Sequence, residues 1–177
     1  MSLLAQEIKQ NRPFRSLEEE ALLNLARTFE VNHTRLGEFL RQFDLTYTQY
    51  NVLRILKGAG EGGLKCSEVS ARMVNHDPDV TRLMDRLERR GWIVRKRSNA
   101  DRRVVLVAIS PSGLALLAGI DTPLAEFLAG LGGHLGPDRL RQLIGLLEEW
   151  RRGQAAVPAA AVDLSRVPDF SPAPANP

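Results

Sequence analysis

Two arginines lie one helical turn apart on a segment whose other face is apolar. Arg82 and Arg86 stand opposite a stripe at i, i+3, i+4 and i+7 spacing, which consists of Val80, Leu83, Met84 and Leu87. A guanidinium group presents a fork of donors that matches guanine O6 and N7 or phosphate oxygens. A helix with these two faces can pack inward and enter the major groove of DNA. Ion pairs along an exposed helix, such as Arg82 with Asp79, would account for the same arginines.

A basic hairpin is predicted directly after this helix. Residues 92–97 and 104–109 have the composition of strands, and the residues between them, 98–101, favour a turn. The hairpin carries Arg97 on its first strand and Arg102 near its tip. A basic hairpin beside a groove-reading helix can place an arginine in the adjacent minor groove. This succession favours DNA binding over a merely solvated helix face.

Positive charge is concentrated in the same part of the chain. The 177 residues carry 24 Lys and Arg against 21 Asp and Glu. Residues 51–110 hold thirteen of the basic and seven of the acidic residues, so the rest of the chain is acidic overall. A basic centre between acidic flanks is typical of a polyanion-binding region held by neutral or acidic supports.

The remaining composition is that of a globular protein, with 44% hydrophobic and 25% charged residues. Cys66 is the single cysteine, so no disulfide forms within the chain, which fits a reducing cytosol. The N-terminus lacks the basic and apolar regions of a signal peptide. The most apolar stretch, 114–131, is interrupted by Asp121, Pro123 and Glu126, so we expect no membrane span. The sequence predicts a cytoplasmic protein of one domain with extensions.

A long helix and a capped helix are predicted before the basic segment. Residues 17–43 form a helix of about 25 residues with an apolar seam at heptad-like spacing, formed by Leu22, Phe29, Leu36 and Phe43. Its length exceeds what a small core needs and implies a partner helix, in this chain or in another. Thr46 and Gln49 form a capping box that opens a second helix, which stops at 58–60 and leads into a loop at 61–64. A short helix follows over 66–73.

The basic helix and the C-terminal segments have clear boundaries in the sequence. Asp77 as N-cap and Pro78 at the first helical position open the basic helix, and Gly91 ends it after Arg90. One helix is predicted from 111 to a break at 121–123, a second from there to 131, and a third from 137 to 152. Residues 1–15 are polar without periodicity, and the Ala/Pro-rich residues 153–177 are predicted to be disordered.

The order of these elements and several short motifs resemble the MarR family of bacterial transcription regulators. The motifs are residues 45–53 (LTYTQYNVL), 81–88 (TRLMDRLE), 91–93 (GWI) and 101–103 (DRR), with the second strand running into Ser110 and Pro111. The resemblance covers roughly residues 17–150. It implies a mainly α fold: a winged helix-turn-helix with a two-stranded wing and a helical dimerisation region built from the N- and C-terminal helices. It also implies a homodimer, most often a repressor, that binds a pseudo-palindromic operator on double-stranded DNA and responds to a small, aromatic or phenolic effector.

The resemblance divides the chain into five parts: an N-terminal extension (1–15), a dimerisation helix (16–44), the DNA-binding lobe (45–110), C-terminal dimerisation helices (111–152) and the tail (153–177). The DNA-binding residues it implies are Asp79, Thr81, Arg82, Arg86, Arg97 and Arg102. Asp101 and Arg103 would stiffen the wing. The dimer interface would contain Leu22, Phe29, Leu36, Leu140, Leu143, Ile144 and Leu147. An effector pocket is expected near Phe29, His33 and Leu36, although His33 facing solvent fits equally well.

Several residues allow other interpretations. Asp79 stands where the family often has Ser or Thr; it would accept from cytosine N4, weaken phosphate binding, or serve as a first-turn acid favoured by the helix dipole. Cys66 at a helix start suggests a redox- or metal-sensing regulator, or a small half-buried residue. A non-regulatory DNA- or protein-binding module is a third hypothesis. No nucleophile elbow, dinucleotide loop or zinc spacing is present, so we expect neither an enzyme nor a metal or other cofactor.

Overall fold

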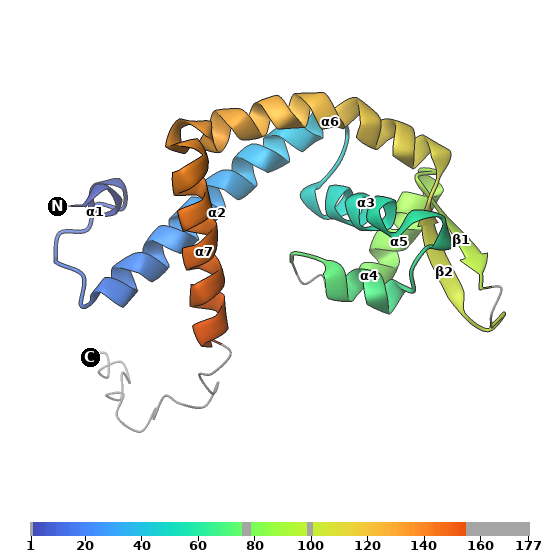
Figure 1. Cartoon of the computed structure of the whole chain (residues 1–177), viewed down its shortest axis with the longest axis horizontal. Coiled ribbons are helices and arrows are strands. Elements are labelled where there is room, and N and C mark those ends of the chain that lie inside the picture. Colours follow the sequence, from blue (N-terminus) through green and yellow to red (C-terminus); the bar gives the residue numbers. More distant parts are fainter. Residues whose placement is uncertain (1, 76–78, 99–100, 155–177) are drawn as a thin grey trace, which may run out of the picture. The chain divides into compact units, whose positions relative to one another are not determined.

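The fold is seen in a computed structural model, which describes residues 2–75, 79–98 and 101–154 (Figure 1). These residues form two compact units, 1–131 and 132 onwards. The elements of the first unit are α1 (Leu3–Glu7), α2 (Leu17–Arg41), α3 (Tyr47–Ala59), the 3-10 turn η1 (Gly60–Gly62), α4 (Cys66–Arg72), α5 (Val80–Arg89), β1 (Ile93–Arg97), β2 (Val105–Ile109) and α6 (Pro111–Gly132). The second contains η2 (Gly133–Leu135) and α7 (Gly136–Gln154). The predicted fold class, mainly helical with one two-stranded hairpin, is confirmed.

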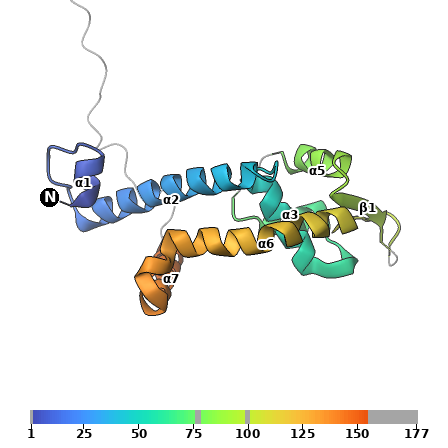
Figure 2. The same ribbon diagram turned by 90° about the horizontal axis from the view of Figure 1, so that it is seen from above.

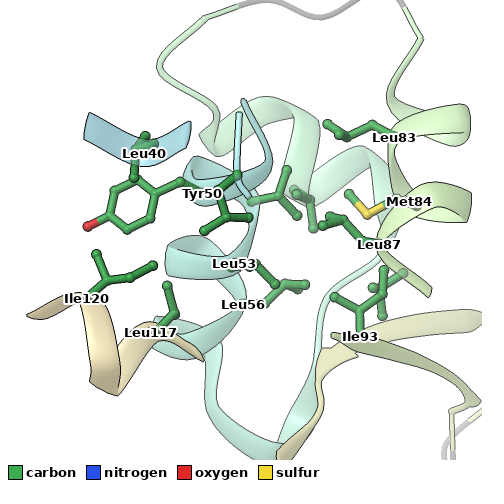
Figure 3. Close-up of a cluster of buried hydrophobic side chains, with 14 of the residues drawn as sticks. Leu40, Tyr50, Leu53, Leu56, Leu83, Met84, Leu87, Ile93, Leu117 and Ile120 are labelled. Carbon is green, nitrogen blue, oxygen red and sulfur yellow. The ribbon is translucent and has the colours of Figure 1, made fainter. Parts of the chain in front are cut away.

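The core lies where α3, α5, the hairpin and α6 meet (Figure 3). The apolar stripe of the basic helix forms one wall of it, and Leu83, Met84 and Leu87 are at most 2% exposed. Helix α3 forms the middle through Tyr50, Leu53 and Leu56, which are all buried. The predicted capping box of α3 is also confirmed, with Thr46 and Gln49 bonding to each other's backbone N–H groups.

The hairpin pairs antiparallel from Ile93 with Ile109 to Arg97 with Val105 and projects from the lobe next to α5 (Figure 2). Residues 61–64 were expected to be a plain loop. Instead η1 ends there and Leu64 bridges to Val107. Gly63 makes this approach possible: its φ is +72°, and a Cβ atom would lie 2.7 Å from the Val107 carbonyl oxygen.

Helix α5 begins later than the sequence indicates. Its N-cap is Asp79, whose Oδ1 accepts from the Arg82 backbone N–H at 3.3 Å. The predicted cap at Asp77 and Pro78 lies outside the described residues. Two aspartates two positions apart offer equivalent caps, and the sequence alone does not rank them.

Helix α6 runs unbroken through Pro123, where the sequence predicts a division. A proline in a helix interior costs about 3 kcal/mol because it removes a hydrogen bond. Packing on both sides of Pro123 offsets this cost: Leu117 and Ile120 are fully buried before it. After it, the Phe127 ring stacks on Phe39 of α2, with centroids 4.7 Å apart.

The ends of the chain also differ from expectation. Residues 3–7 form the short helix α1, capped by Ser2, and the Glu7 carboxylate lies 3.3 Å from Arg27 of α2. Five residues are too few to show a helical period, so this segment looked irregular. Helix α7 continues through Gly153 and Gln154, and the predicted disordered tail beyond it lies outside the described residues.

Large apolar side chains remain exposed on α2, α6 and α7. Leu22 and Phe29 are 55% and 61% exposed, and the described part of α7 contains no buried side chain. The stretch from Pro111 to Gln154 is long and apolar enough to cross a membrane by length and composition, with a mean hydropathy of 1.5 over 18 residues, of which 11% are buried. Within the described residues these side chains form an exposed apolar surface.

Candidate nucleic-acid interface

The outer face of α5 is polar and exposed. Thr81, Arg82 and Arg86 are all exposed, and 82% of the Arg82 side chain faces solvent. The Arg82 Nε lies 3.2 Å from the Asp79 carboxylate, so the ion pair that sequence offered as an alternative does form. An exposed pair of this kind contributes about 1 kcal/mol or less and leaves the guanidinium available to exchange Asp79 for a DNA acceptor.

Asp79 has two structural tasks in the free protein. It caps α5 and it pairs with Arg82. Its carboxylate therefore stands at the N-terminal end of α5, where the helix dipole favours negative charge. Of the three roles weighed for Asp79, this position supports the structural one. Its place next to Arg82 keeps a direct DNA contact open.

Arg95 of the hairpin is committed to the protein itself. Its guanidinium donates to Asp85 and to Glu88 of α5, each at 2.6 Å. The hydrogen bond that Arg95 donates to Asp85 is the main cause that raises the pKa of Arg95 above its ordinary value. This bridge fastens β1 to the polar edge of α5, so the wing and the helix are held as one surface. Sequence analysis grouped Arg95 with the basic hairpin and had no signal for this contact.

The other cations of the hairpin fall into two groups, one bonded to the protein and one exposed to solvent. Lys96 donates to the Glu61 backbone carbonyl and thereby ties β1 to η1. Arg97, Arg102 and Arg103 are exposed. These three are the wing cations that stay available to a polyanion.

The wing tip is held by Asp101 through the backbone. Asp101 Oδ1 accepts from the Arg103 backbone N–H at 2.9 Å, and the Asp101 carbonyl accepts from the Val104 N–H at 2.9 Å. Within the described residues the Arg103 guanidinium forms no ion pair with Asp101, the side-chain pairing considered from the sequence. Asp101 is thus the residue that shapes the tip.

The residues expected at a dimer interface lie in two different environments. Leu36 and Phe43, near the end of α2, pack against the core of their own chain. Leu22 and Phe29, nearer its start, remain exposed. On α7, Leu143 and Ile144 are 43% and 55% exposed, whereas Leu140 and Leu147 are half-buried.

The residues expected at an effector pocket form an aromatic cluster on α2. His33 stacks on Phe29 with centroids 5.3 Å apart and meets Tyr47 edge-on at 5.4 Å. The His33 side chain is therefore occupied by neighbours although it is exposed to solvent, and Leu36 packs toward the core.

A concave pocket of about 490 Å³ lies elsewhere, between α3 and α6. Arg54 and Lys57 bring positive charge to it, and Leu117, Leu124 and Leu128 form an apolar wall. Lys57 Nζ lies 3.0 Å from the Asp121 carboxylate, which ties the two helices across the pocket. Sequence analysis missed this pocket because its residues come from helices about 60 positions apart. A volume in this range suits a small ligand.

Cys66 is free, half-buried and the first residue of α4, after Lys65. Among the described residues no cluster of three His, Cys, Asp or Glu side chains could hold a metal ion. His33 and His134 are exposed in separate units, and His76 lies outside the described residues.

Comparison with known proteins identifies this arrangement. The model of the MarR family matches residues 45–105, which span α3 to the first residue of β2 and include α5, β1 and the tip of the hairpin. The HTH-type transcriptional regulator PrsX of Escherichia coli is 26% identical over 131 residues, which is 73% of this chain and 79% of PrsX.

Solved structures agree with the family match. A MarR transcription factor from Planctomyces limnophilus is 39% identical, with a TM-score of 0.59 over 77% of this chain and 98% of the other. Bordetella bronchiseptica BpsR, solved in work on the regulation of its DNA binding by 6-hydroxynicotinic acid, shares the fold at 23% identity and a TM-score of 0.65, over 75% and 99% of the two chains. The chain is a member of the MarR family of winged helix-turn-helix transcription regulators, which act on DNA and are not enzymes.

Proposed function

We propose that this regulator is a cytoplasmic homodimer that binds a pseudo-palindromic operator and represses transcription. Its operator affinity changes when a small molecule binds. The observation that carries the proposal is the joined surface of α5 and the wing, where Arg82, Arg86 and Arg102 are exposed next to a bridge through Arg95. A rigid surface with two sets of free guanidinium groups suits simultaneous contact with a major and a minor groove.

Each exposed residue has a proposed contact. Arg82 reads a base edge, assisted by Thr81 and Arg86 on the same face. Arg102 enters the minor groove, and Arg97 binds the phosphate backbone beside it. Asp79 releases Arg82 to the base and keeps α5 capped. Asp101, with Arg103, holds the wing in the shape that these contacts need.

The exposed apolar surface supports a dimer. Exposed or half-exposed apolar side chains lie on two helices: Leu22 and Phe29 on α2, and Leu140, Leu143, Ile144 and Leu147 on α7. A helix face that stays in contact with water seldom carries so many large apolar side chains. Two copies joined through these helices would bury about 2,000 Å² or more. A two-fold dimer implies two half-sites about one helical turn apart.

The pocket between α3 and α6 is our proposed effector site. Arg54 and Lys57 attract an anion, and the wall around Leu117 accepts an apolar ring. The regulation of BpsR by 6-hydroxynicotinic acid is a precedent for a small aromatic acid in this family. An anion that competes with Asp121 for Lys57 would loosen α3 from α6 and shift the population of lobe orientations. The aromatic cluster of Phe29, His33 and Tyr47, with Leu36 beside it, is a second site to test.

Binding-site selection from random DNA, followed by footprinting, tests the proposal. A discrete protected site with two related half-sites supports it. Uniform protection along the DNA indicates a compaction module, and unchanged binding after peroxide treatment or chelation excludes a sensor based on Cys66. Titration of the complex with 6-hydroxynicotinate, on wild type and on Lys57→Gln, tests the effector site; Arg139→Gln on α7 removes the same charge as a control. A reporter gene behind the selected site distinguishes repression from activation.

A further inference from the structure

The C-terminal end of α5 is fastened to both helices that lead out of the DNA-binding lobe. Arg90 follows α5 as its C-cap, and its guanidinium donates to the Asp44 carbonyl at 2.8 Å and pairs with the Asp44 carboxylate. Asp44 lies in the turn between α2 and α3. Trp92 lies two residues after Arg90, and its backbone carbonyl accepts from the Ser110 N–H at 3.0 Å. Ser110 stands just before α6. The end of α5 is thus the junction of α2, α6 and the lobe.

The side of this junction that faces α6 is built by close contact. The Gly91 carbonyl accepts from the Ser110 and Ser112 hydroxyls at 2.6 and 2.5 Å. A Cβ atom on Gly113 would lie 2.3 Å from the Trp92 carbonyl oxygen, so no other residue fits there without displacement. This side therefore leaves little freedom between α5 and α6.

On the side of this junction that faces α2, the contact depends on the side chain of Arg90. The Arg90 guanidinium carbon lies 3.9 Å from the centre of the Trp92 ring, so the group is held between Trp92 and Asp44. Asp44 has a left-handed backbone with φ of +56°, which turns its carbonyl and carboxylate toward the same guanidinium. The Asp44 side chain is 84% exposed and that of Arg90 35%, and an ion pair so exposed contributes little to stability. Its fixed geometry points to a task in positioning.

A small change in the orientation of α5 at its Arg90 end produces a larger displacement at its Arg82 end. Arg82 and Arg90 are eight residues apart, roughly 12 Å along the helix axis. A tilt of about 5° around the Arg90 end displaces the Arg82 backbone by roughly 1 Å, which is enough to spoil a bidentate hydrogen bond to a base. Arg90 itself stands too far along α5 to share that base contact.

We propose that Arg90 is a positioning residue for DNA recognition, which fixes the angle of α5 against the end of α2 through Asp44. The inference rests on the proposed role of α5 as the sequence-reading helix. It assigns operator discrimination partly to two residues that do not touch DNA.

The decisive variant is Asp44→Asn. Asparagine tolerates the left-handed backbone, so the turn is kept while the charge is lost. Loss of a negative charge alone strengthens binding to any DNA. Our proposal predicts the opposite for the operator: affinity for the selected duplex falls about threefold, while affinity for an unrelated duplex of the same length stays or rises. Arg90→Gln, which also loses the carbonyl bond and the stacking, lowers operator affinity about tenfold, and the double variant is no weaker than Arg90→Gln.

Arg41→Gln is the matched control. It removes the same charge three residues before Asp44, and within the described residues the Arg41 side chain bonds to the Gly37 carbonyl of its own helix and to no other group. It should leave the ratio of operator to unrelated affinity unchanged. A lower melting temperature with an unchanged ratio in Asp44→Asn would show a merely structural pair and overturn the proposal. Equal losses on both duplexes in Arg90→Gln would show a phosphate contact and overturn it as well.

A measurement without DNA separates this inference from the proposed function. If selection yields no preferred sequence, the proposed function fails, and hydrogen exchange of the last turn of α5 then decides on the clamp. Exchange about fivefold faster in Asp44→Asn and Arg90→Gln, but not in Arg41→Gln, supports the clamp; unchanged exchange in all three refutes it.

Discussion

The apolar side chains of the DNA-binding lobe are buried within one chain, whereas many of those on the helices around it are exposed. Within residues 45–110, Val52, Leu56, Met84 and Leu87 are fully buried by other parts of the same chain. On α2 and α7 comparable side chains such as Phe29 and Ile144 are more than half exposed. This difference is the one expected of our proposed dimer, in which one copy buries the core behind α5 and the wing and a second copy covers the exposed side chains of α2 and α7.

The largest expected effect is in the lobe core. Leu87→Ala should lower the free energy of unfolding by about 2–5 kcal/mol, because it leaves a cavity against α3 and the hairpin. Val94→Ala, at a position of β1 that is 46% exposed, should change it by about 0.5 kcal/mol or less. Denaturant titration measures both. Equal effects would remove the contrast between a packed and an open region.

The exposed helices should respond in assembly. Ile144→Glu puts a charge on the proposed interface and should raise the dimer dissociation constant about 100-fold or more, because the carboxylate would be buried without a partner. Gln142→Glu introduces the same charge at an exposed polar position of α7 as a control. Sedimentation at several concentrations distinguishes them. If both variants behave as wild type, α7 is not part of the interface.

On the DNA-binding surface, Arg82→Ala should cost roughly 1–3 kcal/mol on the selected operator and relax the preference at one base pair per half-site. Arg102→Ala should weaken binding with little change in preference and reduce the salt slope by about one unit. Arg139→Ala removes the same charge from an exposed position of α7, outside α5 and the wing. A salt-titrated binding series provides the comparison, and an unaltered base preference in Arg82→Ala would refute its assignment as the reader.

The wing tip should show a smaller effect with a clear asymmetry. Asp101→Ala removes the acceptor of the Arg103 backbone N–H and should cost about 1 kcal/mol of wing order and operator affinity. Arg103→Ala keeps that hydrogen bond and loses only the free guanidinium, so it should act through salt-dependent DNA affinity. Strongly non-additive losses in the double variant would instead indicate a side-chain pair between the two residues.

The smallest effect concerns pH. Burial is the main cause that raises the pKa of Tyr50 above its ordinary value. The folded state therefore keeps the phenolic proton of Tyr50 up to a higher pH than the unfolded state does. The stability that the neutral phenol contributes is full below about pH 10 and is lost as the pH rises further. Tyr50→Phe should flatten this alkaline decline in melting temperature. Identical curves for the two proteins would contradict the assignment to Tyr50.

Local patterns predict most of the lobe and little of what joins its parts. The stripe of Leu83, Met84 and Leu87, the capping box at Thr46 and the hairpin follow from spacing and residue type, because each is decided by neighbours within one helix or turn. The partners of Arg95 and Arg90 come from other elements, so no local pattern distinguishes them from the exposed Arg82 and Arg97.

The misjudged segments have physical reasons of the same kind. Helix α1 is too short for a period, and α6 passes Pro123 because tertiary contacts of Ile120 and Phe127 outweigh a local penalty. The pocket at Lys57 and Asp121 exists only once two distant helices meet. Spacing and residue type therefore predict the exposed arginines of α5 and the wing but not the contacts with other elements that hold α5 in place.

The molecular mass in solution tests most directly whether a second copy completes the open helices. Light scattering of the wild-type chain at micromolar concentration should give about twice 19.7 kDa, with or without a membrane-mimicking detergent. The same sample bound to the selected operator should contain two chains per duplex. A mass of 19.7 kDa, with the two half-sites filled independently and without cooperativity, would contradict the account.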